Sequence, residues 1–328
     1  MERRSLPWTA AVGTGAALAL AAASAYGALQ TATPAHAIPV APKASVRGKI
    51  AYESPKGGIW TMSANGTHRR RVTHTKPGVD FDPNWAPSGK QLVFRTRRGH
   101  HLPDPSGIGV DGIFVISASG RREHPVHPPS GGLAADWSPD GRLIVMSGVS
   151  DGREVLFTVH PDGTHLHNLG ISGEGAIWSP DGHELAFGWH GPGEEWQVWV
   201  STASGQDAHA LTRPPVDPQA PLGSAGDAGA LWSPDGHQIA FSRGAGVHRD
   251  LWLMNADGSN QHEILHWRGA DSPNVWLPNG QIVFAHYGLG GTRLRWFMVN
   301  PDGTRLRSLR WLDGIATDPL DWLIRGAR

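Results

Sequence analysis

The stretch Trp232-Ser233-Pro234-Asp235-Gly236 decides the fold of this chain, because close copies of it recur along the sequence. The other copies begin at Trp85, Trp137, Trp178 and Trp276, and in every copy Gly stands four residues after Trp. These positions place successive Trp residues 52, 41, 54 and 44 residues apart. A period of this length is typical of a repeat architecture.

The local sequence of each copy predicts a β-hairpin. In Ser-Pro-Asp-Gly, Pro presets its φ angle and Gly accepts a positive φ, so the four residues favour a tight turn. The apolar residues that follow, such as 238–241, indicate a short buried strand. A second hairpin follows in each repeat, with its turn ending at Gly258 and, in the other repeats, at Gly66, Gly120, Gly163, Gly205 and Gly303. Each repeat therefore predicts four antiparallel strands, which form one propeller blade.

The two ends of the repeat region complement each other. The first repeat, around residues 48–52, lacks a first strand of its own, and a matching segment stands at 318–322, where Trp322 lies 46 residues after Trp276. We expect this C-terminal strand to join the N-terminal blade, because that closure removes an open sheet edge. The fold prediction is all-β: a single six-bladed β-propeller over residues 47–328.

The Trp-Ser-Pro-Asp-Gly and Asn255-Ala256-Asp257-Gly258 turns resemble those of the TolB-type, WD-like propeller repeats, over about residues 46–328. That family includes the periplasmic TolB component of the Tol–Pal envelope system and propeller domains of some peptidases. The resemblance implies an exported, non-catalytic binding or scaffold propeller of the cell envelope. The partner it implies is an envelope protein or a glycan.

The N-terminal segment reads as a leader and not as part of the propeller. Arg3 and Arg4 precede an Ala-rich apolar run over 10–29, and Ala35-His36-Ala37 matches an Ala-x-Ala cleavage signal. We predict a signal peptide over residues 1–37, or an uncleaved anchor as the alternative, and an exposed linker over 38–46. The expected location is extracytoplasmic: secreted, periplasmic or cell-wall associated.

Composition limits the chemistry further. Lys and Arg total 29, as do Asp and Glu, so the formal charge is zero and nothing indicates a nucleic-acid partner. The chain has no Cys, which excludes disulfides, thiolate metal sites and a Cys nucleophile. We expect a monomer that meets a membrane only through an uncleaved N-terminal segment, and the sequence requires no cofactor.

Connection lengths differ between the two faces of the predicted disk. The segments 95–112 and 212–231 are long, and both connect strands on the side opposite the Trp turns. We call that side the elaborated face and predict the binding site there, because loops on a rigid scaffold carry function. Its candidate binding residues are Trp189, His190, Trp267, Arg268, Tyr287 and Trp311, whose rings, if exposed, suit a sugar or a protein partner.

Imidazole and carboxylate groups also gather in these connections. Together they are the ligand types that a divalent metal takes, and the candidate ligands are His74, Asp80, Asp82 and His248. The alternative function is therefore a metal-dependent polysaccharide lyase or hydrolase. The repeat Trp residues are assigned to the core: Trp85, Trp137, Trp178, Trp232, Trp276 and Trp322. Asp136 and Asp321, each directly before a repeat Trp, are expected to bond to nearby backbone.

Overall fold

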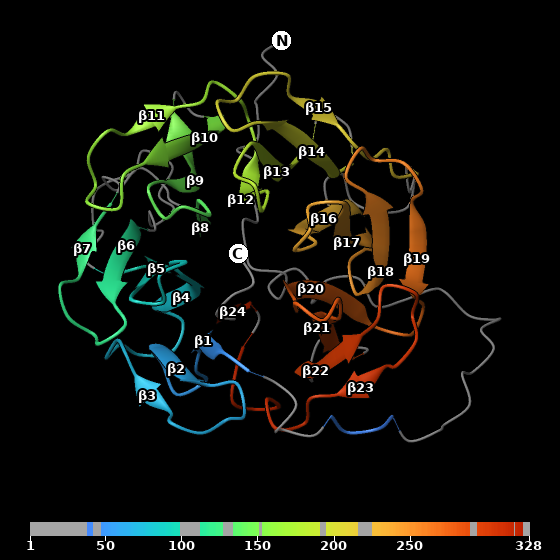
Figure 1. Ribbon diagram of the computed structural model, residues 1–328, viewed down its shortest axis with the longest axis horizontal. Helices are drawn as coiled ribbons and strands as arrows, with labels where there is room; N and C mark the ends of the chain where they lie inside the picture. Colours follow the sequence, from blue (N-terminus) through green and yellow to red (C-terminus); the bar gives the residue numbers. More distant parts are fainter. Residues whose placement is uncertain are drawn as a thin grey trace, which may run out of the picture.

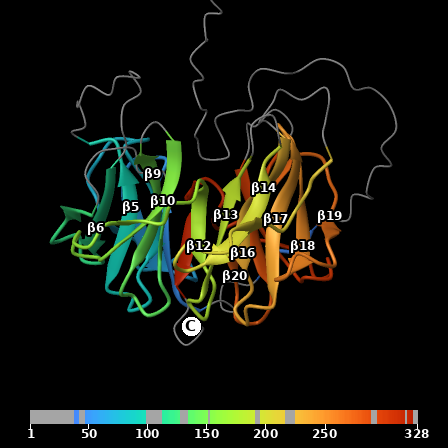
Figure 2. The same cartoon turned by 90° about the horizontal axis from the view of Figure 1, so that it is seen from above.

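The computed structural model describes residues 38–41, 47–98, 112–126, 134–150, 153–190, 195–215, 225–288, 294–317 and 319–323. These residues form an all-β propeller, in which sheets stand as a ring around a central channel (Figure 1). Figure 2 turns the ring on its edge and shows strands running between its two faces. The predicted leader, 1–37, and linker residues 42–46 lie outside the described residues. Linker residues 38–41 were predicted to be exposed, but Val40 forms a parallel bridge with Ser308 and Ala41 is buried.

Four sheets contain four strands each, and we number them as units. Unit 1 contains β24 (Leu320–Leu323), β1 (Lys49–Glu53), β2 (Ile59–Ser63) and β3 (Arg70–Arg71). Unit 2 contains β4 (Asp80–Trp85), β5 (Gln91–Thr96), β6 (Gly112–Ser117) and β7 (His124–Pro125). Unit 3 contains β8 (Ala135–Trp137), β9 (Ile144–Ser150), β10 (Arg153–Val159) and β11 (His167–Asn168). Unit 4 contains β12 (Glu174–Trp178), β13 (Glu184–Trp189), β14 (Gln197–Thr202) and β15 (His209–Ala210).

The fifth sheet contains eight strands in two antiparallel runs of four. Unit 5 is the run β16 (Ala225–Trp232), β17 (Gln238–Ala245), β18 (His248–Asn255) and β19 (His262–Leu265). Unit 6 is the run β20 (Ala270–Trp276), β21 (Ile282–Tyr287), β22 (Leu294–Val299) and β23 (Arg307–Ser308). The sequence predicts separate four-stranded blades throughout. Units 5 and 6 differ because one parallel bridge, Arg249 to Ala270, joins β18 to β20.

Closure by the C-terminal strand is confirmed. The antiparallel pairing of β1 with β24 sets Lys49 opposite Leu323 and Ala51 opposite Asp321. The indole nitrogen of Trp322 donates a hydrogen bond of 3.0 Å to the carbonyl of Arg47. In Figure 1 the last strand lies directly beside the first one.

The Trp turns have the geometry that their residues favour. The Gly that ends each turn has a φ between 65° and 82°, a range that residues with a Cβ rarely adopt. In the turn at 138–141, Asp140 accepts hydrogen bonds from the Ser138 hydroxyl at 2.7 Å and the Arg142 backbone N–H at 3.0 Å. The Arg142 N–H and then the Ser138 hydroxyl lower the pKa of Asp140. The turns at 179–182 and 233–236 repeat both bonds.

The apolar core is divided among the junctions between units. Each of six buried clusters draws side chains from two neighbouring units, including one cluster shared by units 6 and 1. The six repeat Trp residues lie in these clusters with 1–8% of their surface exposed. Burial of one large aromatic ring at every junction holds neighbouring sheets face to face. Among the described residues, no helix has the length and apolarity that a membrane crossing requires.

Candidate functional site

A pocket of about 180 Å³ opens at the central channel on the face that carries the Trp turns. We call this face the Trp-turn face; its turns are 86–89, 138–141, 179–182, 233–236 and 277–280. Each inner strand runs toward this face and ends at or next to its repeat Trp. Side chains alternate along a strand, so when Trp packs between units the residue before it faces the channel. The pocket is thus built from the inner strands β4, β8, β12, β16, β20 and β24.

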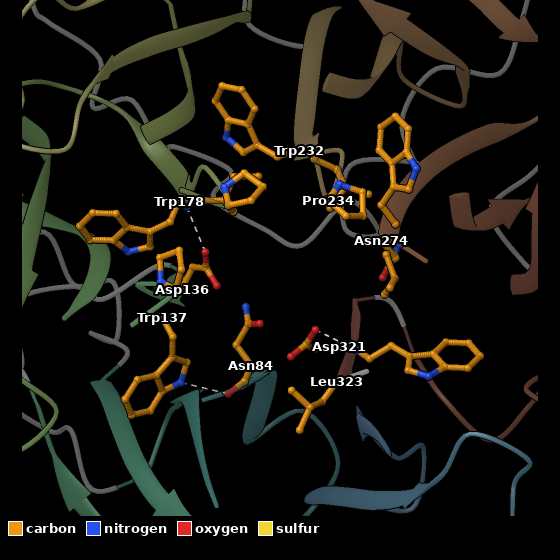
Figure 3. Close-up of a pocket in the computed structure, with 16 residues that line it drawn as sticks. Asn84, Asp136, Trp137, Trp178, Trp232, Pro234, Asn274, Asp321 and Leu323 are labelled. Carbon is orange, nitrogen blue, oxygen red and sulfur yellow. Dashed lines mark hydrogen bonds between the residues drawn. The ribbon is translucent and has the colours of Figure 1, made fainter. Parts of the chain in front are cut away.

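Four polar side chains point into this pocket: Asn84, Asp136, Asn274 and Asp321 (Figure 3). Each also bonds the backbone of the next unit. Asp136 accepts the Trp178 N–H at 3.1 Å, and Asp321 accepts the Trp85 N–H at 2.6 Å. The expectation that both aspartates bond to backbone is confirmed, with the refinement that the backbone belongs to the neighbouring unit.

The two amides act in the same way as the two aspartates. Asn84 donates to the Ala135 carbonyl at 3.2 Å, and Asn274 accepts the Leu320 N–H at 2.9 Å. Units 6, 1, 2, 3 and 4 are therefore tied in series around the channel. A carboxylate oxygen can accept more than one hydrogen bond, so Asp136 and Asp321 can hold a backbone N–H and still carry their charge into the pocket.

The opposite wall of the pocket is apolar. The channel-facing positions of units 4 and 5 are Ile177 and Leu231, both partly buried, and Pro180 and Pro234 of the Trp turns lie beside them. The pocket therefore offers two carboxylates on one side and a hydrocarbon surface on the other. This arrangement suits a guest with an apolar stem and a cationic head.

The predicted aromatic residues of the elaborated face lie in separate places. Trp189 ends β13 with its ring edge on Trp199 at 4.9 Å between centroids, and His190 follows it with its ring 4.6 Å from that of Trp196. Trp267 is half-buried, and its indole N–H donates to the Asp271 carboxylate at 2.7 Å.

Two of the other three predicted residues, Arg268 and Tyr287, lie near Trp267, because Ala270 pairs with Tyr287 at the end of the β20–β21 hairpin, whereas Trp311 lies elsewhere. Arg268 is exposed, and Tyr287 ends β21 half-buried. Trp311 is buried, with 8% exposed, and its ring packs at 6.2 Å from Trp322 and against the turn at Gly66. That turn belongs to the Trp-turn face, so Trp311 does not present a ring on the elaborated face.

The predicted metal ligands are not brought together within the described residues. Asp80 is fully buried and accepts hydrogen bonds from Thr75, Thr96 and Arg98 at 2.6–2.9 Å. Asp82 lies 3.1 Å from the Arg95 guanidinium, while His74 and His248 are exposed on units that do not adjoin. In the part of the chain that the structure describes, one group of three potential ligands lies within 4.8 Å, and it consists of other residues: Asp250, Glu263 and His266.

Three buried aspartates repeat at one inner-strand position, five residues before a repeat Trp: Asp80, Asp227 and Asp271. Asp227 forms two bonds of 2.7 Å with Arg243, and Asp271 receives His286 at 2.8 Å. Burial raises the pKa of Asp271, while the His286 bond opposes that rise. Because each carboxylate is enclosed with its own hydrogen-bonding partner, these pairs link neighbouring β-strands and do not face a ligand.

Two glutamates, Glu174 and Glu154, interact near the elaborated-face end of the inner strand of unit 4. Burial, and then the charge of Glu154, raise the pKa of Glu174 to about 7, although Arg95 lowers it in part. Burial likewise raises the pKa of Glu154. Glu174 therefore titrates close to neutral pH, which matters for stability.

The sequence prediction missed the central pocket as a site. Loop length directed it to the elaborated face, whereas the pocket is lined by short turns and strand ends. The sequence did contain a signal: in four of the six repeats a polar residue stands one or two positions before the repeat Trp. These residues are Asn84, Asp136, Asn274 and Asp321.

The ring of sheets, the Trp turns and the strand closure define the class by fold: the chain is an all-β propeller whose fold is like that of TolB. The crystal structure of TolB from Acinetobacter baumannii matches 84% of this chain with a TM-score of 0.62 and 18% identity, a likeness of fold. This chain spans 66% of that protein.

Two sequence relatives match this chain, one over most of its length and one over a short segment. The chain is 26% identical over 272 residues to the uncharacterized protein Atu1656 of Agrobacterium fabrum, covering 67% of this chain and 89% of that protein. It is 31% identical over 100 residues to the Tol-Pal system protein TolB of Anaeromyxobacter dehalogenans, covering 30% of this chain and 20% of TolB. No family model matches the chain.

Proposed function

We propose that this chain is an exported, non-catalytic binding propeller of the cell envelope, in which units 5 and 6 act as separate blades of a six-bladed ring. The likeness to TolB propellers supports the class, and the leader-like residues 1–37 support export. The partner we propose is an envelope protein that inserts a basic side chain into the central pocket.

One observation carries this proposal: the carboxylates of Asp136 and Asp321 point into the pocket (Figure 3), and the apolar part of its lining includes Ile177 and Leu231. A volume of about 180 Å³ is below the roughly 300–1,000 Å³ typical of pockets for drug-sized ligands, so it fits one side chain better than a whole small molecule. Lys and Arg combine a hydrocarbon stem with a charged head, which matches the two walls.

The direct test titrates the full-length chain with arginine amide and follows Trp fluorescence, because repeat Trp residues surround the pocket. Citrulline amide, which has the same shape without the charge, is the matched probe. The double substitution Asp136→Asn and Asp321→Asn keeps one oxygen at each position for the N–H of the next unit, Trp178 or Trp85, but removes both charges. We expect the double variant to bind arginine amide at least tenfold more weakly than the wild type does. Citrulline amide should bind the wild type and the double variant equally weakly.

A capture experiment compares the two faces. The full-length chain is used to retain proteins from an envelope extract, with the aspartate double variant beside a Trp189→Ala and Trp267→Ala variant. The proposal expects capture to be lost in the first variant and kept in the second. The opposite result would move the site to the elaborated face, and arginine amide binding that ignores both aspartates would refute the role of the pocket.

A further inference from the structure

A second hollow lies on the Trp-turn face, at the outer side of the junction between units 1 and 2. It is a groove of about 510 Å³ between the strand ends β1, β2 and β3 and two turns of unit 2. The turns are 86–89, which follows the repeat Trp85, and 118–120, which follows β6. Neither the predicted sites nor the central pocket includes this groove.

The groove is basic. Its walls carry Lys49, His68, Arg70 and Lys90, and no Asp or Glu stands among the lining residues that the structure describes. None of these four side chains forms an ion pair with a described carboxylate. The chain as a whole has zero formal charge, so this is a local concentration of positive charge.

The cations are held on both walls. Arg70 of unit 1 donates a hydrogen bond of 2.5 Å to the Ser119 carbonyl of unit 2, across the groove. The Lys49 ammonium lies 5.6 Å from the centroid of the Trp85 ring, so it too reaches from unit 1 toward unit 2. Hydroxyl groups stand between these charges, from Thr61, Ser63, Ser88, Ser117 and Ser119.

Comparison among the repeats shows that acids are missing here at two turn positions where three other units have them; unit 6 also lacks the first acid, with Asn279, and unit 4 the second, with Ser204. The third residue of the Trp turn is Asp140, Asp181 and Asp235 in units 3, 4 and 5, but Ser88 in unit 2. The residue before the Gly of the second hairpin is Asp162, Asp257 and Asp302 in units 3, 5 and 6, but Asn65 and Ser119 in units 1 and 2. The turn positions nearest the groove have therefore all lost their negative charge.

The same comparison shows a cation gained. Lys49, Gln91 and Gln238 occupy the same position in their units: each begins the second strand and pairs with the last residue of the third, Ser63, Ser117 or Asn255. Two other units thus hold an uncharged Gln where unit 1 holds Lys. Loss of acids and gain of a base at one junction is the pattern that an anion site requires.

We propose that this groove binds a phosphate or sulfate group. Two ammonium groups and a guanidinium supply charge from several directions, and the imidazole and serine hydroxyls can donate hydrogen bonds to the remaining oxygens of a tetrahedral anion. The volume is large enough for a group of sugar size beside the anion. This site is separate from the central pocket and does not depend on its function.

The experiment titrates the full-length chain with inorganic phosphate and with sulfate, by calorimetry at low and moderate salt. Two of the substitutions come from equivalent positions in the chain's own repeats. Lys49→Gln copies Gln91 and Gln238, and Ser88→Asp copies Asp140, Asp181 and Asp235. Lys90→Gln is added to Lys49→Gln so that the double variant lacks both ammonium groups. We expect each variant to lose at least tenfold in affinity for both anions.

The matched control is Arg142→Gln, which removes a cation at the position equivalent to Lys90 in unit 3. Its side chain is 85% exposed and lies 3.7 Å from its own Asp140. Affinity must stay unchanged in this variant. Equal affinity in wild type, Ser88→Asp and the Lys double variant would overturn the proposal, as would a loss of the same size in the control.

Further arms distinguish the source of the anion. Glucose 6-phosphate stands for a phosphorylated sugar, and phosphatidylglycerol vesicles against phosphatidylcholine vesicles stand for a lipid headgroup. A probe that binds the wild type at least tenfold more tightly than inorganic phosphate does, but binds Ser88→Asp no more tightly, identifies the class of molecule that bears the anion. If none exceeds inorganic phosphate, the proposal holds for the free anion, provided that Ser88→Asp abolishes its binding.

Discussion

The junction between units 1 and 2 and the junction between units 4 and 5 both bury a repeat Trp, yet they are fastened at opposite ends. The first is tied on the Trp-turn face, where Asp321 accepts the Trp85 N–H. The second has Leu231 and Ile177 at the channel and is tied on the elaborated face, where Trp196 and Gly226 form a parallel backbone bridge.

The remaining junctions follow one pattern or the other. Asn84, Asp136 and Asn274 tie three of them at the channel, and the bridge from Arg249 to Ala270 ties units 5 and 6. Where a side chain makes the tie, a polar group must stand in the channel. Where the backbone makes it, the channel residue is free to be apolar. The two-sided character of the central pocket is thus a consequence of how the ring is fastened.

The largest effect is expected from Gly226→Ala, which disrupts the backbone bridge between Trp196 and Gly226. Gly226 has a φ of 117°, and a Cβ there would lie 2.3 Å from the Trp196 carbonyl oxygen. We expect a loss of about 3 kcal/mol in the free energy of unfolding, from backbone strain and a broken bridge. Urea denaturation measures it.

The control for this change is Gly229→Ala. Gly229 also has a positive φ, 67°, but the nearest atom to a Cβ there is a Pro273 carbon at 3.8 Å. It should lose only about 1 kcal/mol, the strain of the φ angle alone. Equal losses at the two glycines would mean that the bridge contributes nothing.

The next largest effect is expected from Asp321→Ala, which removes the side-chain hydrogen bond between units 1 and 2. The carboxylate accepts the backbone N–H groups of Trp85 and Trp322, at 2.6 and 2.7 Å. Their loss should lower the free energy of unfolding by about 2 kcal/mol, since buried donors would be left unpaired. Asp321→Asn keeps an acceptor and should lose less than half as much. If both variants lose the same amount, the charge and not the hydrogen bond is what matters.

The smallest effect concerns pH. Folding raises the pKa of Glu174 from 4.5 to about 7, so between these values the folded chain holds a proton that the unfolded chain has released. Stability attributable to this group therefore falls as pH rises from 4.5 to 7. Glu174→Gln should flatten this part of the profile and raise the Tm at pH 7.5 by a few degrees, measured by thermal melts across that range. A fall of unchanged slope in the variant would assign the pH dependence to other groups.

The two kinds of tie also show what the sequence could and could not predict. The turn residues are local: Pro and Gly at fixed offsets define each hairpin, and the spacing of Trp85 to Trp322 defines the ring and its closure. The backbone bridge at Gly226 depends on how two sheets approach each other, and no motif marks it. The join of units 5 and 6 into one sheet was missed for the same reason.

Prediction of the site was limited in a different way. Loop length indicated the elaborated face, but Trp311 packs into the core and Trp267 bonds Asp271, so neither presents a free ring. The channel and groove sites depend on side chains that converge from separate repeats. The substitution of Ser88 for the usual turn Asp was visible in the sequence, and aligning the repeats position by position would have found it.

Closure through β24 also sets an order in time. The hydrogen bond between Trp322 and Arg47 joins residues 275 positions apart, and contacts of such separation form late in folding. During synthesis unit 1 has only β1, β2 and β3, with the edge of β1 open, until residues 320–323 have been made. The ring therefore cannot close before almost the whole propeller has been synthesised.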